Sequence, residues 1–280
     1  MSNLKSQISN IQSQLESAYP KDEAEALAWW IAEELSGLSR TQLLCGCKDT
    51  TFLSNTQDII ERILHFEPIQ YIFGHSLWCG LDLKVTPATL IPRPETAELV
   101  ERIQSTEYRV QTDHAFRVLD IGTGSGCIAI AHKKRHPEWQ ITGIDISEEA
   151  IEVAKENAVR NGVEVEFKKQ DIFADSVDSI GTFDVVVSNP PYICEREKET
   201  IRHNVLDYEP ATALFVPDDD PLRFYRRIAS LHLGKQLFFE INEAYPQELT
   251  AMLAELGYTD IQLTHDIYGK PRIIQARSTR

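Results

Sequence analysis

The sequence has no long apolar run and little positive charge. No segment of its 280 residues approaches the ~20 consecutive apolar residues of a membrane-spanning helix. Residues 1–15 are polar and lack the apolar core of a signal peptide. The chain has 28 Lys and Arg against 43 Asp and Glu, a formal charge of −15, which disfavours binding through nucleic-acid phosphates. We therefore expect a cytoplasmic protein with no membrane partner and no direct binding to nucleic acid.

The sequence also lacks the usual spacings of metal ligands and disulfides. The five cysteines, an odd number without a C-x-x-C pair, are Cys45, Cys47, Cys79, Cys127 and Cys194. This pattern favours reduced thiols, although Cys45 and Cys47 leave a metal site open as an alternative. The eight histidines show no H-E-x-x-H or similar spacing. We predict no metal.

Length and periodicity predict two domains. A chain of 280 residues with 42% hydrophobic content is long for one domain and can bury a sizeable core. In residues 1–75 apolar side chains recur at the spacing of an α-helix. Turn signals at Pro20, Gly37 and Gly46 divide this region into three or four predicted helices. A bundle of this size suits a module that recognises a partner. The alternative is an appendage that only stabilises the rest of the chain.

The remaining residues alternate between helical and strand patterns. Residues 77–85 alternate apolar and polar side chains, which predicts a hairpin within a linker at 76–90. Residues 91–280 then form an α/β domain with a doubly wound sheet. Its predicted strands are 117–121, 140–144, 164–169, 183–188 and 237–241, closed by the pair 261–264 and 272–276.

A glycine-rich loop follows the first of these strands. Asp120 and Ile121 end the strand, and Gly122-Thr123-Gly124-Ser125-Gly126 leads into a helical run. Glycines allow a ligand to approach the backbone closely, although a simple strand-to-helix turn would read the same way. The spacing is G-x-G-x-G, whereas the pyrophosphate of a nicotinamide dinucleotide requires G-x-G-x-x-G.

Acidic residues follow the next two strands. Asp145 ends the strand at 140–144, where a carboxylate suits the two hydroxyls of a ribose. Asp171 and Ile172 follow the strand at 164–169, where a carboxylate can meet an adenine amino group and an apolar side chain can flank the ring. Either aspartate could instead be a helix N-cap. The carboxyl ends of parallel strands meet at one edge of a sheet, so we expect all three segments to converge there.

The tetrapeptide Asn189-Pro190-Pro191-Tyr192 follows the strand at 183–188. The Asn189 side-chain oxygen and the Pro190 carbonyl can both accept from one planar NH₂ group, which directs its lone pair at a methyl donor. The consecutive prolines fix φ and have no N–H to compete, and Tyr192 offers a flat face for stacking. A plain Asn-Pro turn is the alternative.

The ordered set of glycine loop, Asp145, Asp171 and Asn-Pro-Pro-Tyr resembles the S-adenosylmethionine-dependent methyltransferases of the seven-strand doubly wound class. Four segments resemble one family more closely, the peptide chain release factor glutamine methyltransferases of the HemK/PrmC type. They are Glu67–Gly74, Leu90–Val100, Asn189–Tyr192, and Tyr208–Pro210 together with Ala213 and Leu214. The resemblance covers almost the whole chain, and the helical region is its least matched part.

The resemblance implies an N-terminal helical domain that engages a release factor. It also implies a C-terminal domain that methylates the side-chain nitrogen (N5) of the glutamine in the factor's Gly-Gly-Gln motif. Its cofactor residues correspond to Asp120, Gly122, Thr123, Gly124, Ser125, Gly126, Asp145, Asp171, Ile172 and Asn189. The catalytic residues correspond to Asn189, Pro190, Pro191 and Tyr192. Ala97, where the family often has an acid, and Ile172, where some members are aromatic, depart from the pattern.

Three other functions remain open from the sequence. A ribosomal-protein glutamine methyltransferase shares the Asn-Pro-Pro-Tyr chemistry, but its equivalent loop tends to read Pro-Arg-Ser-Pro, against Pro92-Arg93-Pro94-Glu95 here. A methyltransferase acting on amino groups of DNA or RNA is disfavoured by the acidic charge. A non-catalytic partner that binds S-adenosylmethionine would have no use for the Asn189 motif.

Overall fold

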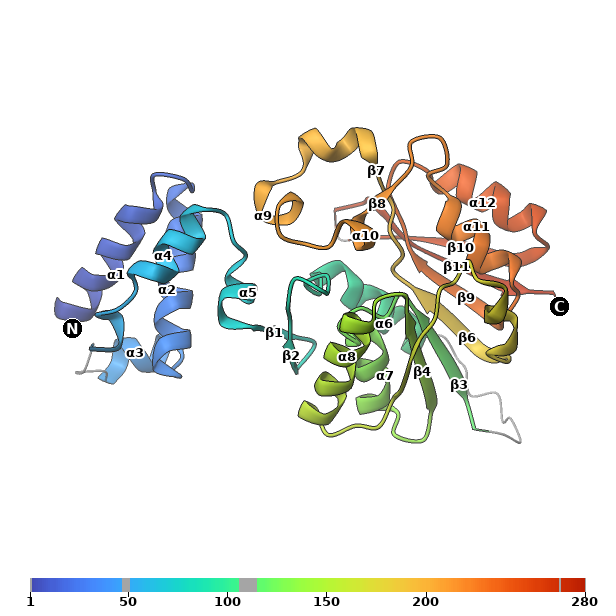
Figure 1. Cartoon of the computed structure of the whole chain (residues 1–280), viewed down its shortest axis with the longest axis horizontal. Coiled ribbons are helices and arrows are strands. Elements are labelled where there is room, and N and C mark those ends of the chain that lie inside the picture. Colours follow the sequence, from blue (N-terminus) through green and yellow to red (C-terminus); the bar gives the residue numbers. More distant parts are fainter. Residues whose placement is uncertain (1, 47–50, 106–114, 267, 280) are drawn as a thin grey trace. The chain divides into compact units, whose positions relative to one another are not determined.

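The protein is described here by a computed structural model that covers residues 2–46, 51–105, 115–266 and 268–279 (Figure 1). It divides into two compact units. The helical unit comprises Met1–Gly74 together with His203–Tyr208. The sheet unit comprises His75–Arg202 and Glu209–Arg280.

The helical unit buries the apolar faces of short helices against one another. Its described elements are α1 (Ser2–Leu15), α2 (Lys21–Ser36), α3 (Arg40–Gly46), the 3-10 turn η1 (Thr51–Leu53), α4 (Gln57–Leu64), α5 (Ile69–Phe73) and α9 (His203–Leu206). α2 ends where Gly37 adopts a φ of 67° and donates its N–H to the Glu33 carbonyl, because glycine enters the left-handed region without strain. Ile31 and Ile60 are among the fully buried side chains of the unit.

A segment from much later in the chain completes the helical unit. The rings of Phe66 and His203 lie 5.5 Å apart, and the Tyr208 hydroxyl donates to the His65 carbonyl at 2.8 Å. Contacts over more than a hundred residues leave no periodic pattern, so the predicted division at residue 75 does not include this segment.

The sheet unit is built on a seven-stranded sheet of order β10-β11-β9-β6-β3-β4-β5. Five neighbouring strands, β9 to β5 in that order, are parallel, and β11 and β10 continue the sheet in antiparallel pairing. The strands are β3 (Arg117–Ile121), β4 (Gln140–Asp145), β5 (Glu166–Lys169), β6 (Phe183–Ser188), β9 (Gly234–Glu240), β10 (Tyr258–His265) and β11 (Pro271–Ser278). The predicted doubly wound α/β fold is confirmed.

Helices cover both faces of this sheet (Figure 1). One face carries α6 (Pro94–Ser105), α7 (Cys127–Arg135) and α8 (Glu148–Arg160), and the other carries α11 (Arg223–Ser230) and α12 (Pro246–Glu255). Successive strand residues point to opposite faces, so Val185 and Val187 pack under the first layer while Val186 packs under the second. Burial on both faces explains why four of the six residues of β6 are apolar.

The sheet unit also contains shorter elements outside the seven-stranded sheet. They are the antiparallel hairpin of β1 (His75–Trp78) and β2 (Leu81–Lys84), the parallel pair β7 (Ile193–Cys194) and β8 (Phe215–Val216), the 3-10 turns η2 (Asp175–Ser179) and η3 (Glu195–Thr200), and α10 (Ala211–Leu214). The hairpin lies within the segment expected to be a linker, but it belongs to the sheet unit itself.

The predicted strand positions agree closely with the structure, and their ends differ where pairing overrides local sequence. β9 starts at Gly234, three residues before the predicted apolar run, because Gly234 pairs with Phe183 of β6. Strand pairing extends through Lys235 and Gln236, whose side chains hide the pattern. β10 and β11 are longer than predicted for the same reason, since each is held by a neighbouring strand.

Candidate active site

The strand order brings the glycine loop and the Asn189 segment side by side. The chain runs outward from β3 to β4 and β5, then returns to β6 on the other side of β3. Ile121 is paired with Ser188, and the Ser188 hydroxyl donates to the Ile121 carbonyl at 2.6 Å. Ligands of open α/β sheets bind beyond the carboxyl ends of the strands at such a reversal. The two predicted motifs therefore begin at adjacent positions of that edge.

The conformation of the glycine loop is fixed by left-handed φ values and by main-chain hydrogen bonds to the neighbouring strand β4. Gly122, Gly124 and Gly126 adopt φ values of 71°, 54° and 80°. The N–H groups of Gly122 and Thr123 both donate to the Ile144 carbonyl, at 2.9 and 3.0 Å. A Cβ atom added at Gly122 would meet nothing within 4 Å, so the backbone there faces open space. The loop is thus a strand-to-helix turn that also leaves room for a ligand against its main chain.

Asp120 lies beneath this loop and has no exposed surface. Its Oδ2 accepts from the Thr123 hydroxyl at 2.7 Å. Burial raises the pKa of the Asp120 carboxyl from its ordinary 3.8 to about 7, against the lowering effect of the Thr123 hydrogen bond. Because Asp120 is enclosed, we infer that its contribution to a ligand site acts through Thr123.

The pH dependence of unfolding should report this burial. The raised pKa means that the folded state holds the proton more tightly, so the free energy of unfolding falls as pH rises from about 4 to about 7. Asp120→Asn cannot ionise, and its stability relative to wild type should rise between about pH 5 and about pH 8. Urea unfolding of both proteins at these two pH values measures the effect. A difference that is the same at both values would contradict the raised pKa.

Asp145 ends β4 and supports the glycine loop. Its two carboxylate oxygens accept from the N–H groups of Gly124 and Ser147, each at 2.9 Å. Burial raises the pKa of the Asp145 carboxyl, and these N–H donors oppose the rise. The N-cap of α8 is Ser147, whose hydroxyl accepts from the Ala150 N–H at 3.1 Å. Asp145 is therefore not the helix cap, and its oxygens retain acceptor capacity for a ligand.

The end of β5 joins the same edge. The Gln170 N–H donates to the Asp145 carbonyl at 2.8 Å, which places Asp171 and Ile172 beyond neighbouring strand ends. Asp171 accepts from the Phe173 N–H at 2.8 Å and is not the cap of η2, which is Ala174. Ile172 is buried.

An exposed apolar side chain at this edge was missed by the sequence reasoning. Ile146, directly after Asp145, is 57% exposed. An exposed isoleucine beside a half-buried carboxylate suits contact with a flat apolar group of a ligand. The sequence signal was its place next to Asp145, but only the structure shows that it is uncovered.

The Asn189 segment is anchored by a buried carboxylate. Asn189 Nδ2 donates to the Thr96 hydroxyl at 3.2 Å, and that hydroxyl donates to Glu240 at 2.7 Å. The Tyr192 hydroxyl donates to the other oxygen of Glu240 at 3.2 Å. The Asn242 side chain donates to the Tyr192 carbonyl at 2.9 Å. The turn is therefore fixed both by its prolines and by its neighbours.

Burial raises the pKa of the Glu240 carboxyl, and the hydroxyls of Thr96 and Tyr192 oppose the rise. Burial also raises the pKa of the Tyr192 phenol well above its ordinary value, with Glu240 adding to the effect. Tyr192 is thus neutral at physiological pH. The sequence reasoning assigned no role to Glu240, although an acid at the end of an apolar strand, as at Asp145, was a usable signal.

The Arg93 segment is held by a second buried carboxylate. Arg93 pairs with Glu209 at 2.6 Å, and the Ile91 N–H donates to the same carboxylate at 3.2 Å. Trp78 donates its indole N–H to the Arg93 carbonyl at 2.8 Å. Burial raises the pKa of Glu209, which the adjacent Arg93 opposes. The segment around Arg93 and the segment around Glu209, both part of the family resemblance, are therefore bound to each other within the sheet unit.

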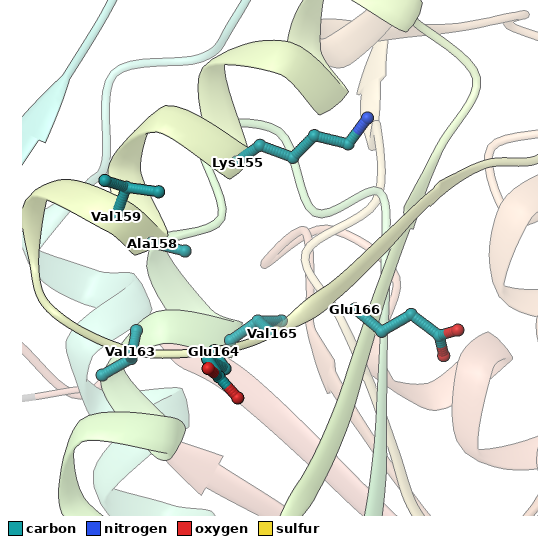
Figure 2. A pocket seen from close by; sticks show the side chains of 7 residues that line it. All are labelled: Lys155, Ala158, Val159, Val163, Glu164, Val165 and Glu166. Atoms are coloured by element: carbon teal, nitrogen blue, oxygen red, sulfur yellow. The ribbon is translucent and has the colours of Figure 1, made fainter.

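A surface hollow of about 430 Å³ lies elsewhere on the sheet unit (Figure 2). α8 and the chain leading into β5 form it, and it is lined by Lys155, Ala158, Val159, Val163, Glu164, Val165 and Glu166. It lies at the start of an edge strand, whereas the groups described above follow the strand ends. The hollow is separate from the candidate site.

Within the described ranges, no three His, Cys, Asp or Glu side chains gather closely enough to hold a metal ion. Cys45 is exposed, and Cys47, its potential partner in a metal site, lies outside the described residues. None of the helices in the described part of the chain is long and apolar enough to cross a bilayer.

Comparison with known proteins agrees with this geometry. Residues 8–74 match the model of the PrmC N-terminal domain, and residues 96–211 match the methyltransferase small domain. The chain resembles the crystal structure of the hMettl16 catalytic domain in complex with MAT2A 3'UTR hairpin 6. That likeness has a TM-score of 0.56 at 18% identity and covers 72% of this chain and 76% of that one. At this identity it shows the fold alone.

Relatives of known name match along almost the whole chain. The release factor glutamine methyltransferase of Bacteroides thetaiotaomicron is 45% identical over 277 residues, covering 95% of this chain and 97% of that protein. The enzyme of the same name from Flavobacterium psychrophilum is 39% identical and covers 93% and 94%. Because relatives at this identity match over more than nine-tenths of the chain, the chain belongs to the release factor glutamine methyltransferase family.

Proposed function

We propose that the protein transfers a methyl group from S-adenosylmethionine to the side-chain amide nitrogen (N5) of the glutamine in the Gly-Gly-Gln motif of peptide chain release factors. The observation that carries this proposal is the pairing of Ile121 with Ser188, which places Asn189 beside the glycine loop. A group held by Asn189 then lies next to a ligand held by the loop. That juxtaposition is what methyl transfer between two bound molecules requires.

The residues of the turn act by holding the amide. Asn189 Oδ1 and the Pro190 carbonyl accept the two hydrogens of the glutamine NH₂ group, which keeps its lone pair free for attack. Pro191 keeps the turn rigid, and the Tyr192 ring packs against the planar amide. The Tyr192 hydroxyl donates a hydrogen bond to Glu240, and its raised pKa keeps it protonated, so it is not the base. Acceptors fixed before the reaction stabilise the positive charge that develops on the nitrogen.

The residues at the strand ends fit S-adenosylmethionine. Open space faces the main chain at Gly122, where the cofactor can approach closely. Asp145 retains acceptor capacity for ribose hydroxyls, and the exposed Ile146 offers an apolar surface. We assign Gly122–Gly126, Asp145 and the Asp171-Ile172 corner to cofactor binding, with Asp120 supporting Thr123. When bound, S-adenosylmethionine would supply an electrophilic methyl group on a sulfonium and be left as S-adenosylhomocysteine, and the methylated nitrogen would lose one of its protons to solvent.

We assign recognition of the release factor to the helical unit. It has its own buried core, and a module of this kind can contact a protein far from the reacting atom. The alternative, a packing appendage, predicts that its removal changes stability without changing the choice of substrate.

Mass spectrometry of a release factor incubated with the protein and labelled S-adenosylmethionine tests the function. We expect one methyl group on the Gly-Gly-Gln glutamine, and no label on a factor in which alanine replaces that glutamine. Label on a ribosomal-protein glutamine, or on RNA, with none on the factor would overturn the proposal in favour of the other substrates considered above.

Removal of the helical unit should separate binding of the cofactor from use of the protein substrate. A fragment of residues 75–280 keeps every proposed cofactor residue, so we expect near wild-type affinity for S-adenosylmethionine. It should methylate an intact release factor about 10-fold or more slowly, because positioning depends on remote contacts. A short glutamine peptide should be a poor substrate for both proteins.

Folding of this fragment is the control, because residues 203–208 lose their partners in the helical unit. Circular dichroism and calorimetry with S-adenosylmethionine establish whether the sheet unit is intact. A folded fragment that methylates the factor as fast as the full-length protein would refute the recognition role. An unfolded fragment would favour the stabilising role instead.

A further inference from the structure

The side-chain amide of Asn189 can present either its oxygen or its NH₂ group to a substrate. The two orientations have nearly the same shape, so the surrounding hydrogen bonds decide between them. Only the orientation with Oδ1 toward the substrate can accept a hydrogen from a glutamine amide. The proposed function therefore requires something in the protein to set this orientation.

The network around Asn189 contains one hydroxyl between two partners. The Thr96 hydroxyl, from the first turn of α6, lies 2.7 Å from Glu240 Oε2 and 3.2 Å from Asn189 Nδ2. Thr96 is 3% exposed and Glu240 is 1% exposed, so water does not compete for these bonds. The other oxygen of Glu240 accepts from Tyr192, and the Tyr225 hydroxyl donates to the Glu240 carbonyl at 3.0 Å.

The direction of the hydrogen bonds follows from counting protons. The hydroxyls of Thr96 and Tyr192 each donate to one oxygen of Glu240, so the single hydrogen of the Thr96 hydroxyl goes to Glu240. The lone pairs of Thr96 then face Asn189, and they can accept only from its NH₂ group. With Nδ2 turned toward Thr96, Oδ1 occupies the other terminal position of the amide and points away from Thr96. Among the described residues none donates to Oδ1, which leaves it available to a substrate.

We propose that Thr96 and Glu240 are positioning residues that fix Asn189 with its oxygen toward the substrate amide. This inference rests on the proposed function. Neither residue touches the reacting atoms, and both act through Asn189. Two charged groups act on the pKa of Glu240: Arg272 lowers it and so favours the ionised form, and Glu95 raises it. Arg272 is itself held by Asp266 at 3.1 Å.

Two substitutions with nearly unchanged shape test the inference. Thr96→Val removes the hydroxyl and should lower kcat on intact release factor about 10-fold or more, by releasing the orientation of Asn189. Glu240→Gln replaces one of the two acceptor oxygens with a donor NH₂ group, so the Thr96 hydrogen is no longer forced away from Asn189, and kcat should fall. The KM for the factor and the Kd for S-adenosylmethionine should stay within about 3-fold of wild type. Thr96→Ser restores the hydroxyl and should recover most of the kcat lost in Thr96→Val.

A double variant distinguishes positioning from general support of the fold. In an Asn189→Ala background Thr96→Val should cause no further loss of kcat, because there is no amide left to orient. Additive losses, or a Thr96→Val enzyme as fast as wild type, would overturn the inference while the wild-type enzyme still labels the factor. If Thr96→Val does not fold, Thr96→Ala decides, because it also removes the hydroxyl, and wild-type kcat in that variant would overturn the inference. A wild-type protein that labels no release factor would overturn the proposed function and this inference together.

Discussion

Asn189→Ala should lower methyl transfer to a release factor by roughly 10² to 10³ while leaving most of the cofactor affinity. The substitution removes a preorganised acceptor that matters most as the glutamine nitrogen gains positive charge. Single-turnover rates with labelled S-adenosylmethionine measure the loss of the chemical step, and calorimetry measures the cofactor affinity.

The structure offers a check on this result. Asn189 contributes one 3.2 Å hydrogen bond to Thr96, and Thr96 keeps its bond to Glu240 without it. The unfolding midpoint should therefore change little. A variant with near wild-type turnover would rule out the role of Asn189, and a variant that loses cofactor affinity by the same factor as rate would make it a cofactor residue only.

Asp145→Ala should weaken S-adenosylmethionine binding by about 1.5 to 3 kcal/mol, which corresponds to roughly 10- to 150-fold in Kd. Part of this loss is a direct charge-assisted hydrogen bond to the ribose. The rest comes from the glycine loop, because Gly124 and Ser147 lose the carboxylate that accepts from their N–H groups. Asp145→Asn keeps one acceptor oxygen, so its affinity for S-adenosylmethionine should lie between those of Asp145→Ala and wild type.

Glu152→Ala is a control matched in charge. Glu152 is exposed on α8 and pairs with Lys155 at 2.7 Å, so its removal changes the net charge near the site without touching the loop. Calorimetric titration of all three variants with S-adenosylmethionine compares them. Unchanged affinity in Asp145→Ala would mean that the cofactor lies elsewhere. An equal loss of affinity in Glu152→Ala would mean that the loss comes from the change in net charge and not from a contact made by Asp145.

The conformation of each motif was determined by the sequence itself. Glycines at 122, 124 and 126 take left-handed φ values that other residues disfavour, and the strands at 117–121 and 183–188 were predicted with their observed ends. Apolar runs of this length, buried on both sides, predict parallel strands, and parallel strands bring their carboxyl ends to one edge. Spacing along the chain therefore predicted the fold, and the candidate residues followed from that spacing together with the family resemblance.

Tertiary structure decided what holds those residues in place. Thr96 and Glu240 are 144 residues apart, and Arg93 and Glu209 are 116 apart. Their pairing depends on how α6 packs on the sheet, and local periodicity does not encode it. The burial of Asp120, the exposure of Ile146 and the joining of residues 203–208 to the helical unit are likewise properties of packing. A side chain's type can be read from the sequence, but its partners and its access to water arise only when distant segments meet.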